Sequence, residues 1–251
     1  MLETVWRSAD RDGSRLLRSA AALAAAVARL PVSLRATAAQ DGLDLLAVLA
    51  GLKPLCLAGR GGAFDAEFRA ALVAAAAAAS LPVLEAAPWE PQAAPGVLPD
   101  WYRAATAQRC AKMRVLYLCR DVGIRDAAAA LSAQGRVAAA DEAALLGYPL
   151  CCVVQHHRQA LGLEQLTIAM TARVAQGDPD RMARLIEAGV EPLPASAEEW
   201  RDYRRLTAIA PAPATSVNMC AACAGDDASP AAALARSHAA LAAATAYPLR
   251  N

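Results

Sequence analysis

Residues 113–119, Met-Arg-Val-Leu-Tyr-Leu-Cys (MRVLYLC), give the clearest β-strand signal in this chain of 251 residues. The run is short, mostly apolar and rich in residues that favour strands, which is typical of a buried strand. Two shorter runs of the same kind precede it, at 53–58 (KPLCLA) and 81–85 (LPVLE). Helical patterns separate the three runs, and this alternation predicts an α/β fold with a small parallel sheet that is covered by helices.

The second half of the chain has a different pattern. We expect no strand beyond Asp121, because glycines and prolines divide the remainder into helical stretches. The chain is therefore expected to form an α/β domain at 1–125 and a mostly helical, cysteine-rich region at 126–251 packed on it. The prolines of 88–99 predict a surface loop. The predicted helices are 14–30, 43–52, 65–79, 100–112, 126–134, 141–146, 151–161, 163–176, 179–188, 197–207 and 230–246.

Charge and composition narrow the range of partners. The 25 basic and 24 acidic residues leave a net charge of +1, which argues against a nucleic acid or a membrane as the main partner. The longest uncharged apolar stretch, 70–84, is shorter than the about 20 residues that a membrane-spanning helix needs. The run at 20–28 is alanine-rich and follows acidic residues, so it predicts an ordinary helix rather than an export signal. We expect a cytoplasmic protein whose seven cysteines stay reduced.

Two pairs of cysteines carry the strongest chemical signal. Cys151 and Cys152 are adjacent, and Cys220 and Cys223 form a Cys-x-x-Cys unit. That unit lets two sulfurs converge, and four thiolates suit one tetrahedral site. Pro149 places the first pair near the start of a helix, where unpaired N–H groups favour thiolates. These four cysteines are therefore the predicted metal ligands, either of an iron–sulfur cluster (4Fe-4S) or of zinc.

Cysteines also have other roles. Four thiols of this kind could be redox-active without a metal, or could be packed as small apolar side chains. Cys56 and Cys119 lie within apolar strand runs, so we expect them in the core, and we expect Cys110 to be structural.

Other polar side chains could complete a site near the cysteines. His156 lies one helical turn after the first cysteine pair and could be a ligand or a neighbour of the metal. His238, on the last predicted helix, is a second candidate of this kind. If the protein is an enzyme, Tyr148, His156 and Arg120 are the candidates for contact with a small-molecule substrate. Arg120 follows the strongest strand, at the end where open α/β sheets bind their ligands.

A glycine turn offers a different site. Gly59, Gly61 and Gly62 follow a predicted strand and precede a helix, which is where a backbone can approach a phosphate group. Phe64 stands where a dinucleotide-binding turn carries its third glycine. Nucleotide binding at this turn is therefore an alternative.

The segment 147–152, Gly-Tyr-Pro-Leu-Cys-Cys, resembles a Gly-Tyr-Pro-x-Cys-Cys motif of a poorly characterised family of prokaryotic domains of unknown function. Cys220 and Cys223 fit a later cysteine pair in these proteins. The chain departs from the family's pattern at 155–157, where Gln-His-His stands in place of an aromatic residue. The resemblance implies a cysteine-ligated cofactor, most simply an iron–sulfur cluster, and it implies no particular reaction.

These observations lead to one main functional hypothesis. We expect a cytoplasmic metal-binding protein that holds an iron–sulfur cluster through four cysteines and acts on a small molecule in a redox or Lewis-acid role. The alternatives are a zinc-stapled structural or partner-binding module without catalysis, and a nucleotide-dependent enzyme that uses the Gly59 turn.

Overall fold

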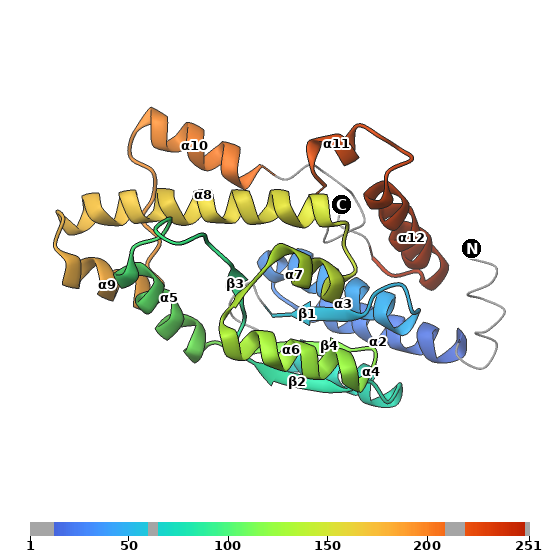
Figure 1. Ribbon diagram of the computed structural model, residues 1–251. Coiled ribbons are helices and arrows are strands. Elements are labelled where there is room, and N and C mark those ends of the chain that lie inside the picture. The colour runs from blue at the N-terminus through green and yellow to red at the C-terminus, as the bar shows by residue number, and fades with distance from the viewer. Residues whose placement is uncertain (1–12, 60–64, 209–218, 249–251) are drawn as a thin grey trace.

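A small sheet lies between helices in the computed structural model, which describes residues 13–59, 65–208 and 219–248 (Figure 1). Its strand order is β1-β4-β2, with β1 at Leu55–Ala58, β4 at Val115–Cys119 and β2 at Val83–Ala86. All five residues of β4 are buried. The central strand is thus the one that the sequence predicts most clearly, because a strand covered on both faces is apolar at every position.

Helices make up most of the described chain, and the predicted helical character of the second half is confirmed. Within the ranges given above, no helix is both long enough and apolar enough to cross a membrane. The bounds are α2 Gly13–Arg29, α3 Val32–Leu49, α4 Ala66–Ala78, α5 Asp100–Lys112, α6 Val122–Gln134, α7 Ala139–Leu146, α8 Leu150–Ala175, α9 Pro179–Glu187, α10 Ala197–Thr207, α11 Ala221–Ala224 and α12 Pro230–Thr245.

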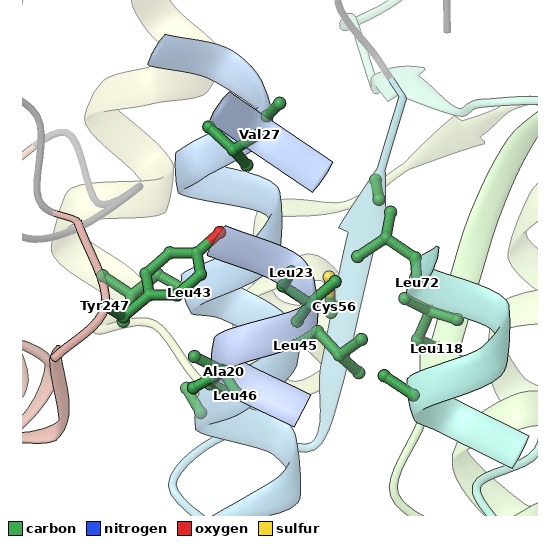
Figure 2. Packing of buried hydrophobic residues seen from close by; sticks show 14 of the residues in the cluster. Ala20, Leu23, Val27, Leu43, Leu45, Leu46, Cys56, Leu72, Leu118 and Tyr247 are labelled. Carbon is green, nitrogen blue, oxygen red and sulfur yellow. The ribbon is translucent and has the colours of Figure 1, made fainter. Parts of the chain in front are cut away.

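One face of the sheet is covered by α2, α3 and α4. Leu118 of β4 belongs to a buried cluster with Leu23 of α2, Leu45 of α3 and Leu72 of α4 (Figure 2). Tyr247, two residues after the end of α12, packs into the same cluster. The last helix of the chain therefore contributes to the core that the first half forms.

The opposite face of the sheet is covered by α6 and α7. Successive side chains of a strand point to opposite faces, so Val115, Tyr117 and Cys119 pack on this side, together with Ala128 of α6 and Leu145 of α7. The result is a three-layer arrangement, with helices on both sides of the sheet.

The predicted parallel sheet is wrong for these three strands. Both outer strands pair with β4 in antiparallel register, Cys56 of β1 opposite Leu118 and Ala86 of β2 opposite Val115. β1 and β2 therefore run in the same direction, and only β4, inserted between them, is reversed. The reason lies in α5, which connects β2 to β4 and packs against α9 rather than over the sheet. The chain therefore enters β4 at the same end of the sheet at which it leaves β2.

A second, two-stranded sheet also corrects the prediction. Glu90–Pro91 (β3) and Arg136–Val137 (β5) pair in parallel, although we expected a loop at 88–99 and no strand beyond Asp121. Pro91 fits in β3 because the residues on either side of it donate their N–H groups across the ladder. Alternate amides of a strand point to the same side, so the proline takes a position whose N–H is not needed.

Two predicted helices, 151–161 and 163–176, are one continuous helix, α8. The two predicted ranges leave Gly162 between them, but this glycine lies inside α8 and serves a packing contact. A Cβ atom at this position would lie 2.6 Å from Cδ2 of Leu206, so the glycine allows α10 to approach α8 closely.

The central position of β4 can be tested with Leu118→Ala. Leu118 is fully buried, and its truncation removes apolar contacts and leaves a cavity, so we expect the free energy of unfolding to fall by about 2–5 kcal/mol. Denaturant unfolding followed by circular dichroism measures this change. Leu17→Ala is the control, because Leu17 of α2 is 45% exposed and a surface change costs about 0.5 kcal/mol or less. Equal losses for the two variants would contradict the placement of β4.

Candidate metal centre

The four predicted cysteine ligands come together at one place. The Sγ atoms of Cys151, Cys152, Cys220 and Cys223 all lie within 4.8 Å of one another. Cys151 Sγ is 3.6 Å from Cys223 Sγ and 4.0 Å from Cys152 Sγ. In a tetrahedral site with metal–sulfur bonds of about 2.3 Å, neighbouring sulfurs stand about 3.8 Å apart. The spacing is therefore that of thiolates able to share one ion.

A tight turn between α7 and α8 positions the first cysteine pair. Gly147 ends α7 in the left-handed conformation, with φ of +71°, and a Cβ atom there would lie 2.8 Å from Cδ of Pro54. Pro149 then precedes the first residue of α8. Cys151 and Cys152 consequently lie in the first turn of this helix, where the Cys152 N–H donates to the Pro149 carbonyl at 3.0 Å.

The second cysteine pair is held by backbone hydrogen bonds. Cys220 stands directly before α11, and its carbonyl accepts a hydrogen bond from the Ala224 N–H at 2.9 Å. The backbone of Cys223 is the main cause of the lowered pKa of the Cys220 thiol. Ser229, which caps α12, donates its hydroxyl to the Cys223 carbonyl at 3.0 Å. The short helix α11 is thus fixed between the first pair and α12.

The site has an apolar inner side and one exposed sulfur. Cys152 and Cys223 are buried and pack with Ala231 of α12, whereas Cys151 is exposed and Cys220 is partly exposed. Burial raises the pKa of Cys152 to about 12 and also raises the pKa of Cys223. A bound cation would offset this cost, because it favours the ionised form of each sulfur.

The other three cysteines lie away from this group. Cys56, Cys110 and Cys119 are all buried, as expected for core residues. Burial raises the pKa of Cys119 to about 12 and raises that of Cys56 well above its ordinary value. The Cys56 and Cys119 thiols are therefore neutral at physiological pH.

The structure does not bring the two candidate histidines into the cysteine group. In the described residues, that group consists of the four cysteines alone. His156 lies further along α8, with its ring centroid 6.3 Å from that of His157. His238 is completely buried in α12, and its two ring nitrogens have no hydrogen-bond partner among the described residues.

The remaining predicted site residues have separate surroundings. Arg120 follows β4, is half-exposed and pairs with Asp121 at 3.4 Å. Gly59 directly follows β1, has a φ of +86° and donates its N–H to Asp41 Oδ2 at 3.0 Å, so this amide already has an acceptor. Gly61 and Gly62 lie outside the described residues.

Two buried polar pairs were not predicted from the sequence. His157 Nε2 lies 2.5 Å from Glu142 Oε2 and ties α8 to α7. Lys53 Nζ lies 2.8 Å from Asp44 Oδ2 and 2.6 Å from Tyr148 Oη. The available signal for the second pair was that Lys53, one of two lysines in the chain, stands at the start of an apolar strand run.

The Lys53 ammonium is charged despite its burial. Its side chain is 0% exposed and that of Asp44 is 8% exposed. Burial by itself lowers the pKa of Lys53, but the nearby Asp44 charge raises it, and the net pKa lies above the ordinary value. The Tyr148 ring also faces the ammonium, with its centroid 4.4 Å from Nζ. Tyr148, predicted as a substrate contact, is thus part of a buried charge network.

The burial of His238 predicts a pH effect on stability. Burial lowers the pKa of His238 to about 4 from the ordinary 6.5. The neutral ring therefore stabilises the fold fully above pH 6.5, and this contribution is lost as the pH falls from 6.5 towards 4. The variant His238→Leu removes the titration. When the pH is lowered from 7.5 to 5, we therefore expect the free energy of unfolding of the wild type to fall by about 2 kcal/mol more than that of the variant. Urea unfolding of both proteins at both pH values measures the difference.

Asp41 has the opposite effect on the pH dependence of stability, but it does not affect the comparison of the wild type with His238→Leu. Burial raises its pKa to about 7, so its contribution improves as the pH falls, but it is common to both proteins and cancels. Parallel pH curves for the wild type and His238→Leu would contradict the placement of His238.

No protein-family model matches this chain, and no curated protein or solved structure is similar enough to it to count as a match. The resemblance of 147–152 to the Gly-Tyr-Pro-x-Cys-Cys family therefore stays a prediction. The chemistry open to this site follows from its own residues and geometry, which are those of a four-cysteine group able to hold a metal ion.

Proposed function

We propose that the protein is a zinc-binding protein in which Cys151, Cys152, Cys220 and Cys223 hold one ion in a structural centre. The observation that carries this proposal is the convergence of four sulfurs, from two distant segments, to within 4.8 Å of one another. A set of four cysteine thiolates is a common ligand set of structural zinc sites.

The sulfur spacing favours a single ion over the iron–sulfur cluster that the sequence suggested first. In a 4Fe-4S cluster each cysteine binds a different iron atom, and sulfide ions separate the irons, so the cysteine sulfurs stand farther apart than around one ion. The distances of 3.6 and 4.0 Å from Cys151 Sγ to its neighbours are close to the edge of a single tetrahedron.

The same ligand count favours a structural role over a Lewis-acid role. Catalytic zinc sites have three protein ligands and keep the fourth position for water or substrate, whereas four thiolates complete the coordination. Zinc has no redox chemistry of its own. A zinc ion here would tie the start of α8 to α11, two segments between which the chain runs through α9 and α10 (Figure 1).

The proposed ligands also indicate a cellular setting. Thiolates bind zinc only while they are reduced, and the four proposed ligands are free thiols. We therefore place the protein in a reducing compartment such as the cytoplasm.

Metal and sulfide analysis of the purified protein distinguishes the possible cofactors. We expect one zinc per chain and no acid-labile sulfide after anaerobic purification, because one tetrahedral set of thiolates binds one ion. If the protein contains iron and sulfide in similar amounts, the cofactor is an iron–sulfur cluster and not zinc. If the reduced protein contains no metal and takes up none when zinc is added, the proposal is wrong.

The structural role is tested with Cys220→Ser. Loss of one thiolate should abolish tight zinc binding and lower the melting temperature, because metal-binding energy contributes to folding. A chelator should lower the melting temperature of the wild type towards that of the variant and leave the variant unchanged. Cys110→Ala is the matched control, since Cys110 is a buried cysteine of α5 outside the site. If Cys220→Ser loses zinc but melts with the wild type, the metal has no structural role.

A further inference from the structure

We propose that Tyr148 is a positioning residue of the metal centre and that the buried pair Asp44–Lys53 acts through it to set the affinity for zinc. This inference rests on the proposed function and extends it from the four ligands to the residues that hold them in place.

Tyr148 contacts both the charge pair and the cysteine site. Its hydroxyl accepts a hydrogen bond from Lys53 Nζ at 2.6 Å. Its side chain also packs against the buried cluster that contains Cys152, Cys223 and Ala231. The tyrosine is therefore a direct physical link between a buried ammonium and two of the proposed ligands.

The chain transmits the position of Tyr148 to the first cysteine pair over a short distance. Tyr148 is followed by Pro149, whose ring restricts φ, and then by the first turn of α8, which carries Cys151 and Cys152. On its other side, Gly147 is seated so closely on Pro54 that a Cβ atom would collide with it. The turn at 147–149 thus contacts the segment 53–54 through two adjacent residues, Gly147 on Pro54 and Tyr148 on Lys53.

The charge pair is a fixed reference for this turn. Lys53 is fully buried, and an ammonium without water must keep its partners, because an unpaired buried charge is costly. Asp44 lies between Leu43 and Leu45 of α3, and both leucines belong to the largest buried cluster. The position of the Lys53 ammonium, and with it that of the Tyr148 hydroxyl, is therefore set by the core.

The second cysteine pair is related to the same charges through α12. Leu241 of this helix belongs to the same buried cluster as Leu43 and Leu45, the two neighbours of Asp44 in α3. The start of α12 binds α11 through the hydrogen bond from Ser229 to the Cys223 carbonyl. Both halves of the metal site are thus placed relative to one buried pair. Ligands that are ordered in advance bind a metal more tightly, because less freedom is lost on binding.

The experiment compares two tyrosine variants of the full chain. Tyr148→Phe removes only the hydroxyl that Lys53 contacts, and we expect the zinc affinity to fall by about 10- to 100-fold, as for other residues that orient metal ligands. Competition with a chromophoric chelator measures the affinity. The visible spectrum of the cobalt-loaded protein reports the geometry of the site, and we expect it to change.

Tyr117→Phe is the matched control. The hydroxyl of Tyr117 donates to the Ala87 carbonyl at 2.7 Å, inside the core that covers the second face of the sheet. Tyr117→Phe loses one hydroxyl hydrogen bond, whereas Tyr148→Phe loses the bond from Lys53 and a longer one of 3.4 Å to Asp44. We therefore expect the melting temperature to fall by about 2–4 °C in Tyr117→Phe and by about twice as much in Tyr148→Phe. Only Tyr148→Phe should change the zinc affinity and the cobalt spectrum.

A second variant tests whether the charge pair acts through the tyrosine. Lys53→Met combined with Asp44→Leu removes both charges together, which avoids an unpaired buried charge. We expect this variant to bind zinc more weakly than the wild type. Adding Tyr148→Phe should then cause little further loss of affinity, because the effects of substitutions at residues that act through one another are not additive. If this charge-free variant does not fold, the comparison of the two tyrosine variants decides.

The possible failures are distinguishable. If the wild type binds zinc and Tyr148→Phe binds it as tightly, the positioning role is wrong and the zinc site stands. An equal loss of affinity in Tyr117→Phe would show that general stability is responsible, which also overturns the positioning role. If the wild type binds no zinc, the proposed function itself fails.

Discussion

The ammonium of Lys53 has to be neutralised where water does not reach it, and this constraint fixes three segments that are distant in the sequence. Asp44 supplies the opposite charge from α3, and Tyr148 supplies an acceptor and a ring face from the turn before α8. An ion pair of this kind gives little net stability, since desolvation offsets most of the attraction. The pair instead fixes the geometry, because the Lys53 ammonium keeps both of its partners only in one arrangement of the three segments.

That arrangement explains why the cysteines converge. Four thiols from two distant segments would repel one another if all were ionised without a cation, and two of them are buried, so attraction among the sulfurs does not hold the site together. The backbone has to bring them together first. The turn at 147–149 places one pair, and the cap of α12 by Ser229 places the other. The sulfurs are thus close before any ion is considered.

Sequence patterns predicted what depends on local residues and missed what depends on tertiary packing. β4 was predictable because burial on both faces makes every position apolar, and the two cysteine pairs were predictable from residue type and spacing. The direction of β4 was not, because it depends on α5 packing against α9. The continuity of α8 through Gly162 depends likewise on a contact with Leu206 of another helix. The role of Lys53 depends on partners at positions 44 and 148, which no local pattern connects.

The parts of the molecule differ in how much they would depend on a metal. The sheet and the helices on both of its faces bury large side chains in two clusters, and this burial stabilises them without an ion. The helix α12 is also held by the core, through Leu241 and the nearby Tyr247. The helix α11 has four residues, too few for a helix to be stable by itself, since nucleation is costly. Its order has to come from its contacts, and the cysteines at its start and within it are the groups for which a bound ion would supply the strongest of these. A metal at this site would therefore stabilise α11 and the first turn of α8 locally, on a framework whose own stability comes from apolar packing.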